Sequence, residues 1–104
     1  MSLVTTHVLD AARGRPAAGI PVRLESPAGL VAEARTDEDG RVRDLGPDEL
    51  APGVYRLVFD TGDYLGQDGF FPEVTVTFRI TDGRAHHHVP ILLSPYAYST
   101  YRGS

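Results

Sequence analysis

The 104-residue sequence contains no cysteine and no tryptophan, and all ten of its basic residues are arginine. Without cysteine, the chain can form neither a disulfide framework nor a zinc site with thiolate ligands. It also lacks an apolar run of the roughly 20 residues that a membrane-spanning helix needs. The basic start and apolar block of a secretory signal are missing too. We therefore expect a cytoplasmic protein that does not bind membranes.

Positive charge is scarce as well, since 14 acidic residues outnumber 10 basic ones and give a formal net charge of -4. A nucleic-acid-binding protein needs a basic surface to neutralise phosphates, so we expect no nucleic-acid partner. The composition, with 41% hydrophobic and 23% charged residues, is that of an ordinary globular chain. Its length is that of one domain, and we assign residues 1–104 to a single domain.

Hydrophobic and polar residues alternate along several segments, as they do in half-buried strands. The clearest segment is 73–81, and segments 20–25, 55–60 and 86–93 follow the same period of two. The apolar face of the clearest segment consists of Val74, Val76, Phe78 and Ile80. Each of these segments is expected to bury one face and to expose the other.

Residues suited to tight turns separate these segments at 27–29, 37–40 and 82–84. Residues 60–69 are the one stretch compatible with a short helix. There is no internal repeat, linker or low-complexity tract, and about eight strands at this spacing are typical of a sandwich. We predict an all-β fold, namely a two-sheet antiparallel β-sandwich of about eight strands with one short helix.

The last segment, residues 96–103, is rich in tyrosine, serine and threonine and contains no proline or acidic residue that would hinder strand pairing. We expect it to form an edge strand that pairs with a second copy across a two-fold axis, which gives at least a dimer. The alternative is a monomer in which sheet twist protects this edge.

Four histidines, His7, His86, His87 and His88, are the first chemical signal in the sequence. On a strand, His86 and His88 point to the face opposite the apolar residues, and His87 points the other way. A His-x-His pair on one strand can bind zinc or copper, but it needs further ligands. The alternative is a solvated, polar start of a strand.

The acidic segment 37–40 superficially resembles a calcium loop, but its glycine is fourth from Asp37 and position twelve holds Asp48. We interpret the segment as a turn. Arg41 follows it at the start of a short strand, where it is either a solvated strand end or a group that binds an anion or a developing oxyanion. No nucleophile elbow, phosphate-binding loop or dinucleotide motif is present, and we expect no cofactor.

Three stretches together carry a specific resemblance to a known family. They are residues 7–17 (HVLDAARGRPA), residues 36–41 (TDEDGR) and residues 88–104 (HVPILLSPYAYSTYRGS). With these stretches the chain resembles the transthyretin family over nearly its full length, and within the family it resembles the branch that hydrolyses 5-hydroxyisourate in uric acid degradation. The terminal Tyr-Arg-Gly-Ser, joined to the preceding Leu-Leu-Ser-Pro-Tyr, is highly specific for that branch.

The resemblance implies a two-sheet sandwich of eight strands and a homotetramer, a dimer of dimers whose active sites lie in a channel between the dimers. The carrier branch of the family typically has lysine, glutamate and threonine where this chain has His7, Arg41 and His88. It also lacks the terminal Tyr-Arg-Gly-Ser. At His87 the family usually has tyrosine or tryptophan, so this chain departs from the pattern there.

The resemblance also implies the residues of an active site. His7, Arg41, His88 and Ser104 would converge on the channel, partly across subunits. His7 and His88 would position and deprotonate water, since histidine titrates nearest neutral pH. Arg41 would stabilise the oxyanion. Ser104 would orient the substrate or the water, and the substrate-binding wall would consist of Tyr101, Arg102 and Gly103.

Two alternatives remain at this point. The first is a non-catalytic, transthyretin-like carrier of a small aromatic ligand. The second is a structural or metal-binding sandwich in which His86 and His88 hold zinc or copper.

Overall fold

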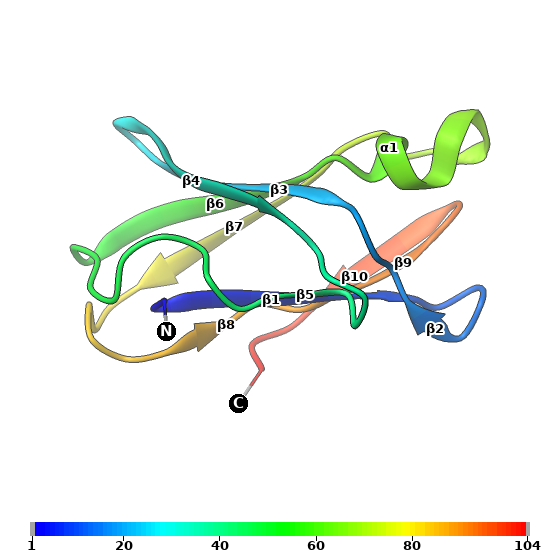
Figure 1. The fold of residues 1–104 in the computed structure, drawn as a ribbon. Coiled ribbons are helices and arrows are strands. Elements are labelled where there is room, and N and C mark those ends of the chain that lie inside the picture. Colours follow the sequence, from blue (N-terminus) through cyan, green and yellow to red (C-terminus); the bar gives the residue numbers. More distant parts are fainter. Residues whose placement is uncertain (1, 104) are drawn as a thin grey trace.

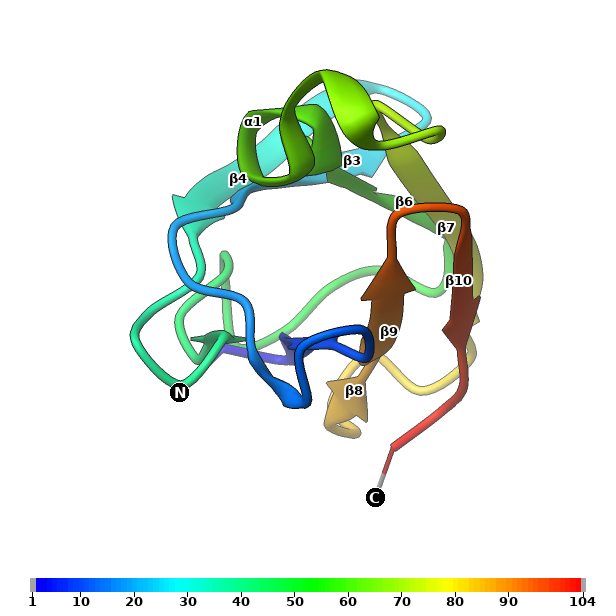
Figure 2. The ribbon, with the colours of Figure 1, turned by 90° about the vertical axis from the view of Figure 1, so that its right-hand side faces the viewer.

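The computed structural model describes residues 2–103, which form two β-sheets packed face to face (Figure 1). Seen along the sandwich, the two sheets form the opposite walls of one layered body (Figure 2). The predicted all-β sandwich is confirmed. Within residues 2–103, seven strands have four residues or more, and three further strands have only two residues each.

The four-stranded sheet is antiparallel throughout, in the order β4-β3-β6-β7, with one register shift between β3 and β4 at Leu24 and Glu25. Its strands are β3 (Pro21–Ser26), β4 (Gly29–Arg35), β6 (Gly53–Phe59) and β7 (Val74–Ile80). The pairing of β6 with β7 runs without interruption from Gly53 opposite Ile80 to Phe59 opposite Val74. The alternation predicted for segment 73–81 is confirmed, because its apolar residues face the core and its threonines are exposed.

The six-stranded sheet is built around β1 (Val4–Asp10). The other strands are β2 (Arg15–Pro16), β5 (Arg41–Val42), β8 (His87–His88), β9 (Ile91–Ser94) and β10 (Ala97–Thr100). Strands β2 and β5 pair with β1 in antiparallel fashion, whereas β8 and β9 pair with it in parallel. The sandwich is predominantly antiparallel, as predicted, and the parallel pairs form where the chain crosses from β7 to the other sheet and lies beside β1.

Strands β8 and β9 are two parts of one predicted segment, separated by Val89 and Pro90. Proline has no backbone N–H to donate to a sheet, which explains the interruption. Strand β10 lies at the edge of this sheet, as expected for residues 96–103. Its pairing with a second copy stays a prediction.

The hydrophobic core lies between the two sheets. Strand β1 points Val4 and Val8 into it, and the four-stranded sheet contributes fully buried residues such as Leu24, Leu57 and Phe59. The neighbouring residues of β1, Thr5 and His7, therefore point to the outer face of the six-stranded sheet, because side chains alternate along a strand. This alternation places polar side chains on the outer face of the six-stranded sheet, while the hydrophobic core packs against its inner face.

One short helix, α1 (Thr61–Leu65), continues as a 3-10 turn, η1 (Gly66–Asp68), and lies at one end of the sandwich (Figure 1). It confirms the helix predicted within residues 60–69. The Asp60 side chain caps its first turn by accepting a hydrogen bond from the N–H of Asp63. No helix in residues 2–103 is long and apolar enough to span a membrane.

Candidate active site

His7 and Arg41 are directly opposite each other on the outer face of the six-stranded sheet. Residue 7 on β1 pairs in register with residue 41 on β5, so both side chains leave the sheet on the same side. The sequence separates these residues widely, and the β1–β5 pairing brings them together.

The turn before β5 fixes the position of Arg41. The Asp37 carboxylate accepts hydrogen bonds from the backbone N–H of Asp39 at 2.8 Å and of Arg41 at 3.0 Å. Gly40 has a φ of 74°, and a side chain there would collide with the carbonyl oxygen of Val8. This glycine therefore lets β5 approach β1 closely, and the turn interpretation of residues 37–40 is confirmed.

The Arg41 guanidinium is half-buried and makes no ion pair or side-chain hydrogen bond within residues 2–103. Its neighbour Arg43 differs, because it pairs with Asp37 at 3.4 Å and with Asp39 at 3.8 Å. A guanidinium without a carboxylate partner can bind an anion with its planar set of donors. Of the two arginines on this strand and turn, Arg41 is therefore the one available for a ligand.

His88 reaches the same face from the other side of β1. Residue 88 on β8 pairs in register with Thr5, and its Nδ1 lies 2.8 Å from the Thr5 Oγ1. The Nε2 of His86 lies 2.8 Å from the same hydroxyl oxygen. The two imidazoles face each other with ring centroids 6.2 Å apart. The predicted His86/His88 pair thus shares one face.

The tautomer of His7 follows from its hydrogen bond. Its Nε2 donates to the carbonyl oxygen of Asp39 at 2.8 Å, and a carbonyl can only accept. In the neutral ring the hydrogen is therefore on Nε2, and Nδ1 keeps its lone pair. This nitrogen is free to accept a proton or a hydrogen bond from water.

A cavity of about 200 Å³ lies on this outer face. It is lined by Thr5, Thr6, Arg41, Val42, Arg43, His86 and His88. Partial burial lowers the pKa of His88, and the positive charge of Arg41, together with His86 and His7, lowers it further. His88 is consequently neutral at pH 7, with a lone pair for a proton.

The C-terminal tail closes against His88. The N–H of Gly103 donates to the carbonyl oxygen of His88 at 2.8 Å, and the two residues form an isolated bridge. A side chain at position 103 would overlap the His88 ring, so glycine is required for this close approach. Ser104 lies outside the described residues.

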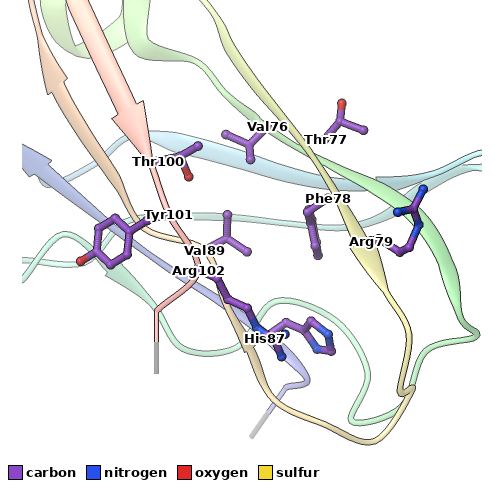
Figure 3. Close-up of a pocket in the computed structure, with 9 residues that line it drawn as sticks. All are labelled: Val76, Thr77, Phe78, Arg79, His87, Val89, Thr100, Tyr101 and Arg102. Carbon is purple, nitrogen blue, oxygen red and sulfur yellow. The ribbon is translucent and has the colours of Figure 1, made fainter.

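Tyr101 and Arg102 lie elsewhere within the chain. They line a different pocket, of about 310 Å³, between β7 and the β8–β10 side of the other sheet (Figure 3). Arg102 lies beside His87 there, and the Tyr101 ring is turned away from them. The structure therefore brings His7, Arg41, His88 and Gly103 together in one chain, but not Tyr101 and Arg102.

His87 points to the inside of the sandwich, as predicted from the alternation. It is buried, and its Nδ1 donates to the carbonyl oxygen of Ala85 at 2.6 Å. A satisfied, buried histidine of this kind supports packing, and it occupies the position where the related family usually has a larger aromatic residue.

Two parts of the site were not singled out from the sequence. Thr5 is nearly buried and contacts both imidazoles, and the carbonyl of Asp39 orients His7. A threonine at an outward position of β1 gives no signal in the sequence, because threonine is common in strands. The position of Thr5 two residues before His7 was the one available indication.

The metal-binding alternative lacks a complete ligand set in the structure. Within residues 2–103 no group of three or more His, Asp or Glu side chains is arranged to hold a metal ion. His86 and His88 instead share the hydroxyl of Thr5.

Comparison with known proteins is consistent with this geometry. A model of the HIUase/Transthyretin family matches residues 4–103. The 5-hydroxyisourate hydrolase of Caulobacter vibrioides is 46% identical, and the match covers all of both chains. The structure of Klebsiella pneumoniae 5-hydroxyisourate hydrolase superposes with a TM-score of 0.90, 34% identity and full coverage of both chains. Transthyretin from Sparus aurata superposes with a TM-score of 0.87 and 28% identity, covering 99% of this chain and 97% of the other.

Proposed function

The chain belongs to the HIUase/Transthyretin family, and we propose that it hydrolyses 5-hydroxyisourate in urate degradation. The observation that carries this proposal is the gathering of His7, Arg41 and His88 on one outer face. The names of the hydrolase relatives supply the substrate. The product would be 2-oxo-4-hydroxy-4-carboxy-5-ureidoimidazoline.

The reaction opens an acyl C–N bond in the six-membered ring of a bicyclic oxidised purine. The oxygen of a water molecule attacks the acyl carbon, and a base takes one proton of that water. The carbonyl oxygen becomes an oxyanion, and the ring nitrogen leaves with a proton. At neutral pH the new carboxylic acid ionises, so one proton is released per turnover.

In the proposed mechanism, two histidines bind and activate the attacking water. His88 is neutral at pH 7, because burial and nearby positive charge lower its pKa, and it can take the proton of the water. His7 keeps a lone pair on Nδ1 while Asp39 holds its Nε2–H, so His7 can orient the same water. General acid–base help of this kind is worth roughly 10²–10⁴-fold in rate.

Arg41 would stabilise the oxyanion and the negative charge of the urate-like substrate. Its guanidinium has no carboxylate partner within residues 2–103, so binding the substrate would break no existing ion pair. Loss of one oxyanion donor typically costs roughly 10²–10³-fold in rate.

The C-terminal tail would complete the substrate site. We propose that Ser104 orients the substrate or the water, since Gly103, the residue before it in the sequence, forms a bridge with His88. Tyr101 and Arg102 line the pocket between the sheets in their own chain. In the proposed assembly they would form part of the substrate-binding wall only through a neighbouring subunit.

We further propose a homotetramer, a dimer of dimers with sites at the interface between dimers, and a cytoplasmic location. The edge strands of residues 2–103 that could pair between copies include β10 in the six-stranded sheet and β4 and β7 in the four-stranded sheet. Analytical ultracentrifugation tests the tetramer, and a monomer at micromolar concentration would contradict it. Fractionation of the source cells tests the location.

The decisive experiment for the activity follows the ultraviolet signal of freshly generated 5-hydroxyisourate. The wild-type protein should accelerate the decay of this signal in proportion to enzyme concentration. Decay at the uncatalysed rate would contradict the proposed function.

The same experiment separates the hydrolase from a carrier. The likeness to Sparus aurata transthyretin shows that the fold alone does not distinguish them. A carrier would bind an aromatic ligand stoichiometrically and would leave the decay rate unchanged.

A further inference from the structure

Thr5 occupies a central position between two imidazoles. Its Oγ1 lies 2.8 Å from Nδ1 of His88 and 2.8 Å from Nε2 of His86. The residue is only 6% exposed, so water cannot easily replace either contact. The three side chains form a continuous chain of hydrogen bonds from the half-buried His88 to the exposed His86.

The number of hydrogens available to these three side chains restricts the tautomers of the two histidines. A threonine hydroxyl has one hydrogen to donate and lone pairs to accept. It can donate to one imidazole nitrogen and accept from the N–H of the other, which satisfies both 2.8 Å contacts when one of the two facing nitrogens is protonated. The tautomers of His86 and His88 are therefore coupled through Thr5.

We propose that Thr5 is a positioning residue that fixes the tautomer of His88, and that Thr5 and His86 together carry a proton between His88 and solvent. This proposal rests on the proposed function, in which the free Nε2 of His88 takes the proton of water. With its hydrogen on Nδ1, His88 donates to Thr5, and Thr5 donates to the unprotonated Nε2 of His86.

The proton transfer balances in four movements. The water proton moves to Nε2 of His88, and the hydrogen on Nδ1 of His88 moves to Oγ1 of Thr5. The hydrogen that Thr5 held moves to Nε2 of His86, and the hydrogen on Nδ1 of His86 leaves to solvent. His88, Thr5 and His86 all end neutral, the hydroxide has attacked, and one proton has left the site. The starting tautomers return when the Nε2–H of His88 protonates the leaving ring nitrogen and the other transfers run in reverse, with a proton taken up from solvent at Nδ1 of His86.

The charges around His88 explain why the proton would not stay there. His88 faces Arg41 on β5 and His7 on β1, with His86 on its own segment, and Arg43 lines the same cavity. A second positive charge beside the Arg41 guanidinium in a partly buried site is unfavourable. His86 is exposed, so positive charge there is hydrated.

The first test replaces Thr5 in two ways. Thr5→Val keeps the branched shape and removes the hydroxyl. It should lower kcat by about tenfold to a hundredfold, a smaller loss than removal of the general base itself would cause. Thr5→Ser keeps the hydroxyl and should restore most of that loss. Thr75→Val, on the exposed face of β7, is the matched control and should leave kcat unchanged.

The second test removes His86, the exposed end of the chain of hydrogen bonds. His86→Ala should lower kcat, and added imidazole should restore part of the loss in proportion to its concentration, because it can accept the proton from Thr5. Imidazole should not restore Thr5→Val, in which the connection to His88 is broken. A loss in His86→Ala that imidazole leaves unchanged would contradict the relay.

The third test reads the tautomer directly and needs no activity. Nitrogen-15 NMR of histidine-labelled protein should show His88 with its hydrogen on Nδ1 in the wild type, and a mixture of tautomers in Thr5→Val. A wild-type His88 with its hydrogen on Nε2 would overturn the proposal.

These outcomes separate the two proposals. Wild-type protein that does not accelerate decay of 5-hydroxyisourate removes the function, and the NMR experiment still decides the tautomer. Active wild-type protein with an equally active Thr5→Val variant removes the relay and leaves the function standing. Equal losses in Thr5→Ser and Thr5→Val would also overturn the relay, since packing alone would then explain them.

Discussion

The two sheets of this sandwich are built differently. The four-stranded sheet has strands of six or seven residues in antiparallel order. The six-stranded sheet gathers strands of two to four residues around β1, in both directions. Long regular strands bury continuous apolar faces, whereas short strands bring the ends of several loops to one place. The hydrophobic core draws on both sheets, whereas the short strands bring His7, Arg41 and His88 to one outer face.

The outer faces of the two sheets differ in the same way. On the four-stranded sheet, exposed ion pairs such as Arg23 with Glu73 at 3.5 Å form an ordinary solvated surface. Such pairs contribute little to stability. On the six-stranded sheet, Arg41 lies beside imidazoles and has no carboxylate partner among residues 2–103. The gathering of Arg41, His7 and His88 on one face distinguishes the sheet that carries the proposed site.

The largest effect on stability is expected in the hydrophobic core, at a residue of the four-stranded sheet. Phe59→Ala empties a fully buried position at the end of β6 and should lower the free energy of unfolding by about 3–5 kcal/mol. Arg56→Ala, on the exposed face of the same strand, should change it by less than about 0.5 kcal/mol. Denaturant unfolding at one protein concentration measures both, and equal effects would contradict the role of Phe59 in the hydrophobic core.

The next effect separates catalysis from stability. His7→Ala, Arg41→Ala and His88→Ala should each lower turnover by on the order of a hundredfold or more, which is about 2.7 kcal/mol of barrier. The free energy of unfolding should change far less than in Phe59→Ala. Near-normal turnover in folded, assembled His88→Ala would remove that histidine from the mechanism.

The pH profile tests the electrostatics of the site. Burial lowers the pKa of His88, and so do the charges of Arg41, His86 and His7. The kcat/KM should stay high at neutral pH and fall about tenfold per pH unit below this lowered pKa. A profile that stays flat below the pKa of His88, measured by NMR titration, would contradict histidine base catalysis.

The lowered pKa of His88 also makes the stability of the protein depend on pH. The folded pKa of His88 lies below its ordinary value of 6.5, so the unfolded chain binds more protons between the two values. Stability should therefore decrease as the pH falls through this window. NMR titration of Arg41→Gln should show the pKa of His88 moving up, since a neighbouring positive charge is removed.

The smallest effect on stability is expected for a hydrogen bond between helix α1 and strand β1 of the six-stranded sheet. The Tyr64 hydroxyl, on α1, donates to the buried Asp10 carboxylate, on β1, at 2.7 Å. Tyr64→Phe should lower the free energy of unfolding by about 1–2 kcal/mol. Tyr96→Phe, at an exposed position, is the matched control and should have no measurable effect.

The Tyr64 contact also has a pH signature. Burial raises the pKa of Asp10, but the hydrogen bonds from Tyr64 and from the backbone of Arg13 and Ala12 outweigh it and leave the pKa below 3.8. The contribution of Asp10 is present above pH 3.8 and is lost as the pH falls through the lowered pKa. A Tyr64→Phe effect that stays constant below that pKa would contradict this account.

Much of the fold could be predicted from the sequence, because burial in a strand follows a period of two. This pattern correctly separated the two faces of β7 and placed His87 inside and His88 outside. The parallel pairing of β1 with β8 and β9 could not be predicted in this way. A strand pattern carries no information about the direction of its neighbour.

The site was predictable only in part. The resemblance pointed to His7, Arg41 and His88, and the structure shows these three on one face. The catalytic roles and the role of Ser104 stay predictions. Thr5 was missed, because a hydroxyl that bridges two histidines is recognised only once the three side chains are placed in space.

By itself, the order of residues determined which side chains face the core and which turns separate the strands. Both are local properties that depend on alternation and on the backbone preferences of glycine and aspartate. Tertiary structure decided which outward residues become neighbours, because only pairing across β1 joins positions 5, 7, 41 and 88. The lowered pKa of His88 and its contact with Thr5 depend on those neighbours, and they arise when the sheet forms.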